Sequence, residues 1–278
     1  MKKNRKIMVA AVLAVAVVAA GCGGTGDKKE AKKETKTESV ADKTTFTLGF
    51  DAEYPPYGYM DDQGEYVGFD LECAQAVCDE LGWKLVKKPL NWDTKDMELD
   101  SGTIDCIWNG FSITPDRKDK YEWSDPYVDN TQVMLVKSDS GIEKLADLKG
   151  KNVVVQAASA ALEALHGEDC KDITDSFASL TENPDYNTAF MNLESGAAEA
   201  VAIDIGVAQY QMAQREKDQY KVLEEPFWTE QYAIGFKKGN TELRDKVQEE
   251  LMKMVKSGKF EEIAVKYGID PKMLCLGK

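Results

Sequence analysis

The sequence predicts an α/β fold in which parallel sheets are covered by helices on both faces. Short apolar runs alternate with segments of helical periodicity along most of the chain. The strand expected at 152–156 has three consecutive valines at its centre, as expected when both faces of a sheet are covered. About 230 residues remain after a hydrophobic start and a polar stretch, enough for one large domain or two small ones.

The expected elements follow one another in this order. The first helix, at 69–81, has Phe69, Cys73, Val77 and Leu81 on one face, and Gly82 ends it. The expected strands are 46–50, 84–86, 104–108, 132–136, 152–156, 198–203 and 231–236. The expected later helices are a short one that ends at Gly102, then 159–165, 187–194, 205–215 and 241–267, the last with a break at Gly258.

The first residues have the pattern of an export signal. Four basic residues within 2–6 precede an uncharged apolar run at 7–20, which is shorter than the roughly 20 residues that a membrane-spanning helix needs. Residues 19–22, Ala-Ala-Gly-Cys, resemble the lipobox of bacterial lipoproteins. The resemblance implies a signal peptide at 1–21 and a lipid on Cys22, with palmitate among its acyl chains. The alternative is an ordinary secretory signal in which Cys22 is incidental.

Residues 22–43 are rich in Gly, Lys, Glu and Thr and nearly free of large apolar side chains. Such a segment buries too little surface to offset its chain entropy. We therefore expect a disordered tether that connects a lipid anchor to a soluble body.

Charge and residue usage exclude several functions. The chain carries a net charge of −14, and loss of the basic signal makes the mature form more acidic, so we expect no nucleic-acid partner. His166 is the single histidine and lies near a predicted turn, where we expect it at the surface, so no catalytic triad is predicted. The five cysteines after Cys22 lack metal-site spacing, and we expect most of them to be core residues.

Chemically versatile residues follow the predicted strands, where ligands bind in sheets of this kind. The loops of interest are 51–57 (Asp-Ala-Glu-Tyr-Pro-Pro-Tyr), 89–93 (Pro-Leu-Asn-Trp-Asp), 109–117 (Asn-Gly-Phe-Ser-Ile-Thr-Pro-Asp-Arg) and Asp204 at the start of a helix.

These loops contain what a free amino acid requires. Arg117 and the hydroxyl of Ser112 can hold a carboxylate. Asp204 and the carbonyl of Gly110 can hold an ammonium group. None of these groups needs to act as an acid or a base.

The side chain of such a ligand needs flat walls, which Tyr54 and Trp92 can form; a cationic side chain would also gain from Asp51 and Glu53. Each residue also has a structural interpretation. Arg117 can be a solvated ion pair, Asp204 can be a helix cap, and the two aromatics can belong to the core or its rim.

Taken together, the motifs resemble the family 3 extracellular solute-binding proteins of polar amino acid ABC importers, over about residues 45–268. The pieces that carry the resemblance are 51–57, Gly-Phe-Asp-Leu at 68–71, Asp105 with 109–117, Tyr-Glu-Trp-Ser-Asp-Pro-Tyr at 121–127, Leu-Ala-Asp-Leu-Lys-Gly-Lys at 145–151, Val155-Gln156 and Ile203-Asp204.

The resemblance implies a two-lobed periplasmic-binding-protein fold of type II, in which each lobe has a mixed, mostly parallel sheet flanked by helices. Lobe 1 would comprise 44–131 and 232–278, and lobe 2 would comprise 132–231. A two-strand hinge would cross near 131–133 and 232–234. Arg117 and Asp204 would then lie on opposite lobes, so that only closure satisfies both ends of the ligand.

The resemblance also implies a ligand site without catalytic residues, metal or cofactor. Its expected members are Asp51, Tyr54, Trp92, Asn109, Gly110, Ser112, Arg117, Gln156, Ser159, Ala160 and Asp204. Two positions depart from the family pattern. Asn109 stands where a small residue is usual, and Ala160 lacks a usual hydroxyl, which leaves Ser159 and backbone N–H groups as the carboxylate contacts of lobe 2.

The function implied is delivery of a free polar amino acid to the permease subunits of an ABC importer by a monomer at the outer face of the cell membrane. Asp51, Glu53, Tyr54 and Trp92 favour a basic amino acid, arginine or lysine, with glutamine or cystine as the alternatives. A second alternative is a dehydratase-like enzyme on the same scaffold, in which Glu53 would be the general acid.

Overall fold

The computed structural model describes residues 40–278. The predicted signal peptide, Cys22 and most of the predicted tether lie outside the described residues. The end of that tether needs correction, because Val40–Asp42 forms the short 3-10 helix η1. Lys43 follows it and forms an ion pair with Asp105 at 2.7 Å, which fixes this segment to the folded body.

The first sheet is mixed, and only its strand at Thr45–Phe50 is parallel to two neighbours. Its order is β5 (Lys84–Pro89), β1 (Thr45–Phe50), β6 (Cys106–Ile107), β14 (Gly235–Lys237) and β7 (Tyr121–Trp123). Phe46, Leu48 and Phe50 of β1 are fully buried, as the apolar pattern predicted. β14 is antiparallel to β6 and to β7 and returns from far along the chain.

Four helices accompany this sheet, namely α1 (Phe69–Leu81), α2 (Lys95–Asp100), α7 (Thr241–Ser257) and α8 (Lys259–Lys266). α1 has the predicted bounds and buries Phe69, Cys73 and Val77. It begins after Gly68, whose φ of 138° suits only glycine and where a Cβ would lie 2.3 Å from the carbonyl oxygen of Tyr57. This close approach holds α1 against the loop that follows β1.

The second sheet has the order β10 (Ser179–Asn183), β9 (Asn152–Gln156), β11 (Ala200–Asp204), β8 (Val128–Lys137) and β12 (Tyr220–Val222), and β13 (Trp228–Tyr232) pairs with β8. Its helices are α3 (Ala160–His166), α4 (Lys171–Ser176), α5 (Tyr186–Ser195) and α6 (Ile205–Ala213). β11 is buried throughout, because Val201 and Ile203 pack with α5 and α6 while Ala200 and Ala202 pack with α3 on the other face.

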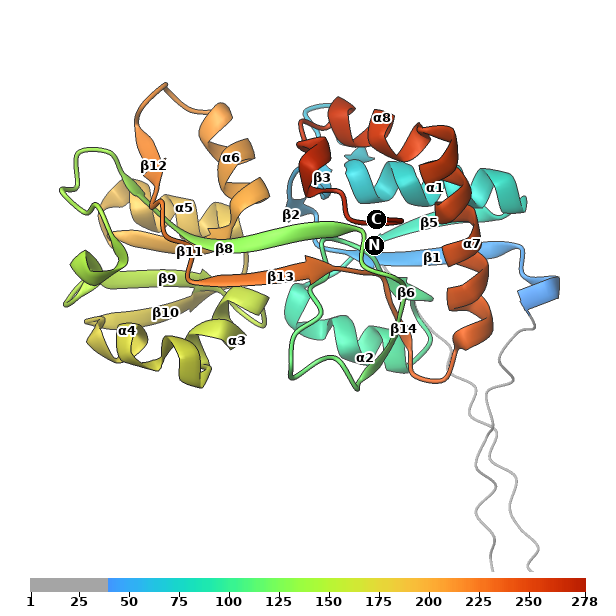
Figure 1. The fold of residues 1–278 in the computed structure, drawn as a ribbon, viewed down its shortest axis with the longest axis horizontal. Helices are drawn as coiled ribbons and strands as arrows, with labels where there is room; N and C mark the ends of the chain where they lie inside the picture. Colours follow the sequence, from blue (N-terminus) through green and yellow to red (C-terminus); the bar gives the residue numbers. More distant parts are fainter. Residues whose placement is uncertain (1–39) are drawn as a thin grey trace, which may run out of the picture. The chain divides into compact units, whose positions relative to one another are not determined.

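Two strands cross between the sheets and give the molecule its two lobes (Figure 1). β8 is ten residues long; residues 128–132 of β8 pair antiparallel with β13, and its remainder lies in the second sheet. Ser112 forms an isolated bridge with Tyr232, which connects the first lobe to β13. Among the described strands, β13 pairs with β8.

The other elements are short. The loop that follows β1 folds into a small sheet of β2 (Glu53–Tyr54), β3 (Gly58–Met60) and β4 (Tyr66–Val67). The remaining 3-10 helices are η2 (Trp92–Thr94), η3 (Leu145–Leu148), η4 (Glu168–Cys170) and η5 (Pro271–Met273). Sequence analysis missed β7, β10 and β12 and the small sheet. It also extended β6 by three residues, although only Cys106 and Ile107 are in regular pairing.

Most of the described cysteines are buried and the histidine is exposed, as predicted. Cys73, Cys78, Cys106 and Cys170 are buried thiols, and within residues 40–278 no disulfide is formed. His166 is exposed at the end of α3. Within the same residues, none of the helices combines the length and apolar composition that a membrane crossing requires.

Candidate functional site

Residues at the carboxyl ends of strands from both sheets meet at one place. Asp51 follows β1, and its carboxylate accepts a 2.6 Å hydrogen bond from the side-chain amide of Gln156 at the end of β9. The backbone N–H of Asp51 donates to the side-chain oxygen of Asn109, which follows β6. Burial raises the pKa of Asp51 to about 6, against the lowering effect of hydrogen bonds from Glu53 and Gln156. Asp51 is thus a buried acid at the junction of the lobes.

Asp204 is the centre of a dense polar cluster. It ends β11 and occupies the cap position of α6, but its side chain makes no capping hydrogen bond. Its Oδ1 instead accepts hydrogen bonds from Asn130 at 2.7 Å, Gln132 at 2.6 Å and the hydroxyl of Tyr232 at 2.7 Å. Its Oδ2 accepts from Tyr186 at 3.1 Å. The carboxylate is therefore held in place by the crossing strands, and its role exceeds that of a helix cap.

Glu230 lies opposite Asn130 on the crossing strand β13, and sequence analysis missed it. Its Oε1 accepts hydrogen bonds from Ser112 at 2.6 Å, Gln132 at 2.8 Å and Asn130 at 3.0 Å. Its Oε2 is buried and has no hydrogen-bond partner among the described residues. Burial and the nearby charge of Asp204 raise the pKa of Glu230 to about 7. Its position, two residues before the predicted hinge crossing at 232–234, was the only indication of this role in the sequence.

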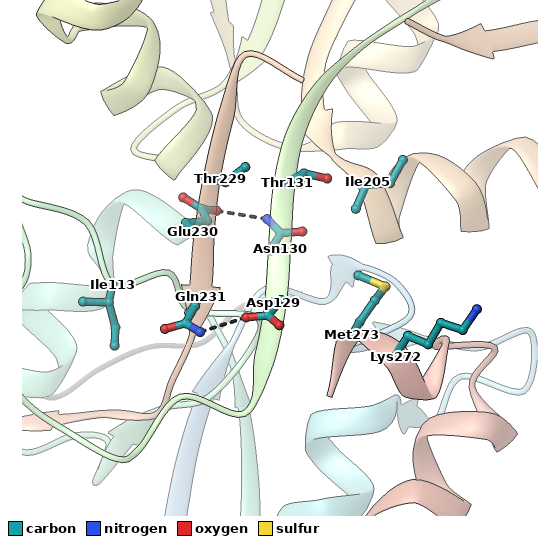
Figure 2. A pocket seen from close by; sticks show the side chains of 10 residues that line it. All are labelled: Ile113, Asp129, Asn130, Thr131, Ile205, Thr229, Glu230, Gln231, Lys272 and Met273. Carbon is teal, nitrogen blue, oxygen red and sulfur yellow. Dashed lines mark hydrogen bonds between the residues drawn. The ribbon is translucent and has the colours of Figure 1, made fainter. Parts of the chain in front are cut away.

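Figure 2 shows the crossing strands from one side. Asn130 and Glu230 are joined by a hydrogen bond across the strands, and Gln231 donates to Asp129 one step further along. These residues line a hollow of about 780 Å³, with Ile113 at one side and Ile205, Lys272 and Met273 at the other. The hinge therefore remains accessible beside the polar cluster.

Arg117 lies where the lobes meet at the other end of the site. Only 3% of the residue is exposed, and its guanidinium group stacks 5.0 Å from the ring centre of Phe111. Its Nη2 lies 2.6 Å from Oε1 of Glu163, and its Nε donates to the same oxygen at 2.8 Å. Thr114 donates to the second oxygen of Glu163 at 2.7 Å. Sequence analysis missed Glu163, whose helical context is that of a surface residue.

Ser112 and Arg117 were expected to hold the same carboxylate, but the structure gives them separate partners. Ser112 contacts Glu230, and Arg117 contacts Glu163. The Nη1 atom of Arg117 has no hydrogen-bond partner within the described part of the chain, which leaves one edge of the guanidinium group available. Both predicted carboxylate-binding residues therefore already contact a glutamate of the protein itself.

Ser159 and Ala160 begin α3 beside Arg117. The hydroxyl of Ser159 accepts the N–H of Leu162 and caps the helix. Ala158, just before them, has a φ of 53°, in the left-handed region that favours glycine. This conformation directs its carbonyl toward the first lobe, where it accepts from Nη2 of Arg117 at 3.0 Å. The left-handed conformation of Ala158 therefore positions its carbonyl oxygen for Arg117.

The aromatic walls belong to two separate groups. The hydroxyl groups of Tyr54 and Tyr232 share a 3.0 Å hydrogen bond, and the rings of Tyr54 and Tyr186 lie 5.9 Å apart. Trp92 packs edge-on against Phe111 instead. Its ring is 5.0 Å from the ammonium of Lys95, a buried cation that sequence analysis missed. Tyr54 therefore faces the acidic end, and Trp92 faces the basic end.

Gly110 is fixed by a buried acid. Its N–H donates to Asp70 at 2.6 Å, and Asp70 also accepts from the hydroxyl of Tyr127 at 2.8 Å. Burial raises the pKa of Asp70 to about 7. Gly110 has a φ of 54°, and a Cβ there would lie 2.8 Å from the ring of Tyr54, so glycine is required. The predicted floor residue Asn109 is accommodated in the same way, since a Cβ on Gly58 would meet its Nδ2 at 2.4 Å.

The site separates charge along its length. Arg117 and Lys95 lie at one end, whereas Asp204, Glu230 and Asp51 lie toward the crossing strands and the end of β1. This arrangement suits a small dipolar molecule. Within residues 40–278 no group of His, Cys, Asp and Glu has the arrangement of a metal site.

Comparisons with known proteins agree with the geometry. The model of the bacterial extracellular solute-binding proteins, family 3, matches residues 46–270. The L-cystine-binding protein TcyJ of Escherichia coli K12 is 30% identical over 92% of each chain. The glutamine-binding protein GlnH of Bacillus subtilis is 31% identical over 96% of this chain and 97% of its own length. A histidine-bound ABC uptake transporter substrate-binding protein from Streptococcus pneumoniae aligns with a TM-score of 0.77 at 34% identity, covering 80% of this chain and 92% of its own.

The raised pKa of Glu230 makes stability depend on pH. Because the folded pKa of Glu230 is about 7 and its ordinary value is 4.5, its burial costs nothing below about pH 4.5 and most above pH 7. Glu230→Gln keeps the hydrogen-bond acceptor and removes the charge. We expect it to raise the free energy of unfolding at pH 8 by about 1–3 kcal/mol and to have little effect at pH 4.5.

Urea unfolding at both pH values measures this difference. Glu143→Gln is the control, because the side chain of Glu143 is 71% exposed, and we expect it to change stability little at either pH. Equal effects of the Glu230 substitution at pH 4.5 and pH 8 would show that the Glu230 charge is not the cause.

Proposed function

Because the chain belongs to the bacterial extracellular solute-binding proteins of family 3, we propose that it captures a free amino acid and delivers it to the permease subunits of an ABC importer. The observation that carries this proposal is the separation of charge across the lobes. Arg117 precedes the first crossing strand, and Asp204 ends a strand of the second sheet. Arg117 and Asp204 are 87 positions apart in sequence, and together they can contact the carboxylate and the ammonium of one small zwitterion.

In the proposed binding mode, the ligand carboxylate lies at the free edge of Arg117 and near the start of α3. The ligand ammonium lies by Asp204 and the carbonyl of Gly110. The 5.0 Å stacking of Arg117 on Phe111 and the four donors around Asp204 support this mode, since both charged groups are held rigidly before binding.

Binding would be coupled to closure of the lobes. Contacts between Asp51 and Gln156 and between Arg117 and Glu163 already connect the lobes. A ligand that contacts Arg117 and Asp204 at once adds differential affinity for the closed form, which is what shifts such an equilibrium. A micromolar dissociation constant corresponds to about −8 kcal/mol, which a few charge-assisted hydrogen bonds can supply.

The division into lobes and the attachment to the membrane are further parts of the proposal. We propose lobe 1 at 44–131 and 232–278 and lobe 2 at 132–231; pairing of residues 128–132 with β13 supports crossings close to these boundaries. We also propose that Cys22 carries the lipid, palmitate included, and that the protein acts as a monomer anchored to the outer face of the membrane. The motif at 19–22 and the composition of the following segment support the anchor.

For the ligand side chain we propose a basic amino acid, arginine or lysine, with glutamine or cystine as alternatives. Asp51 is buried at the site, and Glu53 lines a neighbouring hollow of about 400 Å³ together with Asp61 and Asp62. This concentration of acids favours a cationic group at that end. Relatives named for cystine and glutamine and a neighbour with bound histidine support the wider class.

An enzymatic function is not favoured. The named relatives are transport binding proteins. Glu53, the candidate general acid, accepts a hydrogen bond from Asn187 across the lobes. This contact gives the Glu53 carboxylate a structural partner on the second sheet's helix α5.

A thermal-shift screen of the twenty amino acids and cystine tests the proposed ligand. We expect arginine or lysine to raise the melting temperature most, because Asp51 and Glu53 neutralise a second positive charge. A clear shift with another amino acid and none with a basic one would contradict the basic-ligand proposal. No shift with any of them would contradict the proposed function.

Arg117→Ala should abolish the shift induced by the ligand, since it removes the cation that holds the carboxylate. The fold should persist, because the partner Glu163 has a side chain that is 27% exposed and can be solvated. Arg215→Ala is a matched control, as Arg215 also pairs with a glutamate and stacks 4.2 Å from a phenylalanine ring. Retained micromolar binding in Arg117→Ala would show that the carboxylate lies elsewhere.

A further inference from the structure

Lys95, the first residue of α2, is a buried cation that makes no ion pair among the described residues. Only 5% of the residue is exposed. Its Nζ donates to the carbonyl oxygens of Trp92 and Ala158, each at 3.3 Å, which is at the long end of the range for hydrogen bonds. Within the described part of the chain, no carboxylate lies at ion-pairing distance from it. The ammonium is thus weakly satisfied by neutral acceptors.

This position is unfavourable for stability alone. Burial of a cation without a paired anion costs free energy, and the first turn of a helix disfavours positive charge. Burial, and then the nearby charge of Arg117, lower the pKa of Lys95 to about 8. The charged groups that face it are Arg117, Asp96 on its own helix, Glu163 on α3 and Asp93 on η2. Asp96 is engaged by the hydroxyl of Tyr121.

Lys95 and Arg117 converge on one atom. The carbonyl oxygen of Ala158 accepts from Nζ of Lys95 at 3.3 Å and from Nη2 of Arg117 at 3.0 Å. Glu163 forms an ion pair with Arg117. Among the described residues Lys95 has no such partner, so a ligand carboxylate placed between the two cations would give its ammonium group a direct counter-charge.

We propose that Lys95 is a second cation of the carboxylate subsite, so that the ligand carboxylate is held between its ammonium group and the guanidinium group of Arg117. This inference rests on the proposed function. It assigns Trp92 a different task from the expected one, because the ring supports the ammonium of Lys95 in addition to any contact with the ligand.

A purely structural role would have a different signature. If Lys95 only connects the lobes through the Ala158 carbonyl, a neutral donor serves as well as a charged one. Lys95→Gln keeps a donor without the charge, and Lys95→Met removes both. Lys88→Met is the matched control, since Lys88 forms its ion pair with Glu98 on the same helix and its loss changes the net charge equally.

The test compares an amino acid with its carboxamide in each variant. Dissociation constants for L-arginine and L-argininamide, or for the same pair of the amino acid with the largest thermal shift, are measured by calorimetry at pH 7. We expect Lys95→Met and Lys95→Gln to weaken binding of the acid at least tenfold and to leave binding of the amide nearly unchanged. Lys88→Met should change neither.

The pH profile is a second readout. In the unsubstituted protein, affinity for the acid should fall as pH rises from 7 to 9.5, because Lys95 loses its proton with a pKa of about 8. In Lys95→Met the fall in affinity that is due to Lys95 should be absent. Any remaining change in affinity between pH 7 and 9.5 then arises from titration of the ligand and of other protein groups.

Three results would overturn the inference. These are equal losses for acid and amide, rescue by Lys95→Gln, or unchanged affinity in Lys95→Met, and each overturns it alone. Failure of the unsubstituted protein to bind any free amino acid overturns the proposed function and this inference together.

Discussion

Two carboxylates, Asp204 and Glu230, share the side-chain amides of Asn130 and Gln132, and the site is organised around this shared pair. Each amide donates to both acids, so the four groups behave as one unit. Asn130, Gln132 and Glu230 are on the crossing strands, Asp204 is on the second sheet, and Ser112 adds a contact from the first lobe. A change in the angle between the lobes must therefore alter a buried, charged network, which gives the hinge its preferred arrangement.

The opposite end of the site follows a different principle. Arg117 and Lys95 place two cations at the junction, and Glu163 compensates one of them from the other lobe. An intrinsic glutamate on Arg117 stabilises the closed arrangement before any ligand contacts it. In the proposed binding mode, the ligand carboxylate supplies the counter-charge that Lys95 lacks, so affinity would depend on the balance of charge more than on buried area.

Much of the fold was predictable because its central elements are buried on more than one side. β1, β9, β11 and α1 have apolar patterns that only burial explains, and all of them are in the structure. β10 was missed because its sequence, Ser-Leu-Thr-Glu-Asn, is polar and mostly exposed. Positions after strands predicted Asp51, Asn109 and Asp204 correctly as residues at strand ends, because topology alone brings such positions together.

The missed residues share one cause. Lys95 and Glu230 have polar or charged neighbours on both sides, and Glu163 is a single acid in a run of Ala and Leu, which is the pattern of a solvated helix position. The contacts that these residues make join segments far apart in sequence. Arg117 and Glu163 are 46 positions apart, and Lys95 and Ala158 are 63 positions apart. Local sequence carries no signal for such contacts, and charge compensation across a closed cleft became visible only in the structure.

The central claim is that one amino acid is held by both lobes and closes them. Its most direct test is the distance between spin labels on Met97→Cys in α2 and Met191→Cys in α5, positions that are 64% and 66% exposed. Cys22 and Cys275 are replaced by serine, and the other thiols are buried. Pulsed electron resonance should show that saturating amino acid increases the fraction of molecules at the short distance. An unchanged distance distribution, with binding verified by calorimetry, would contradict the account.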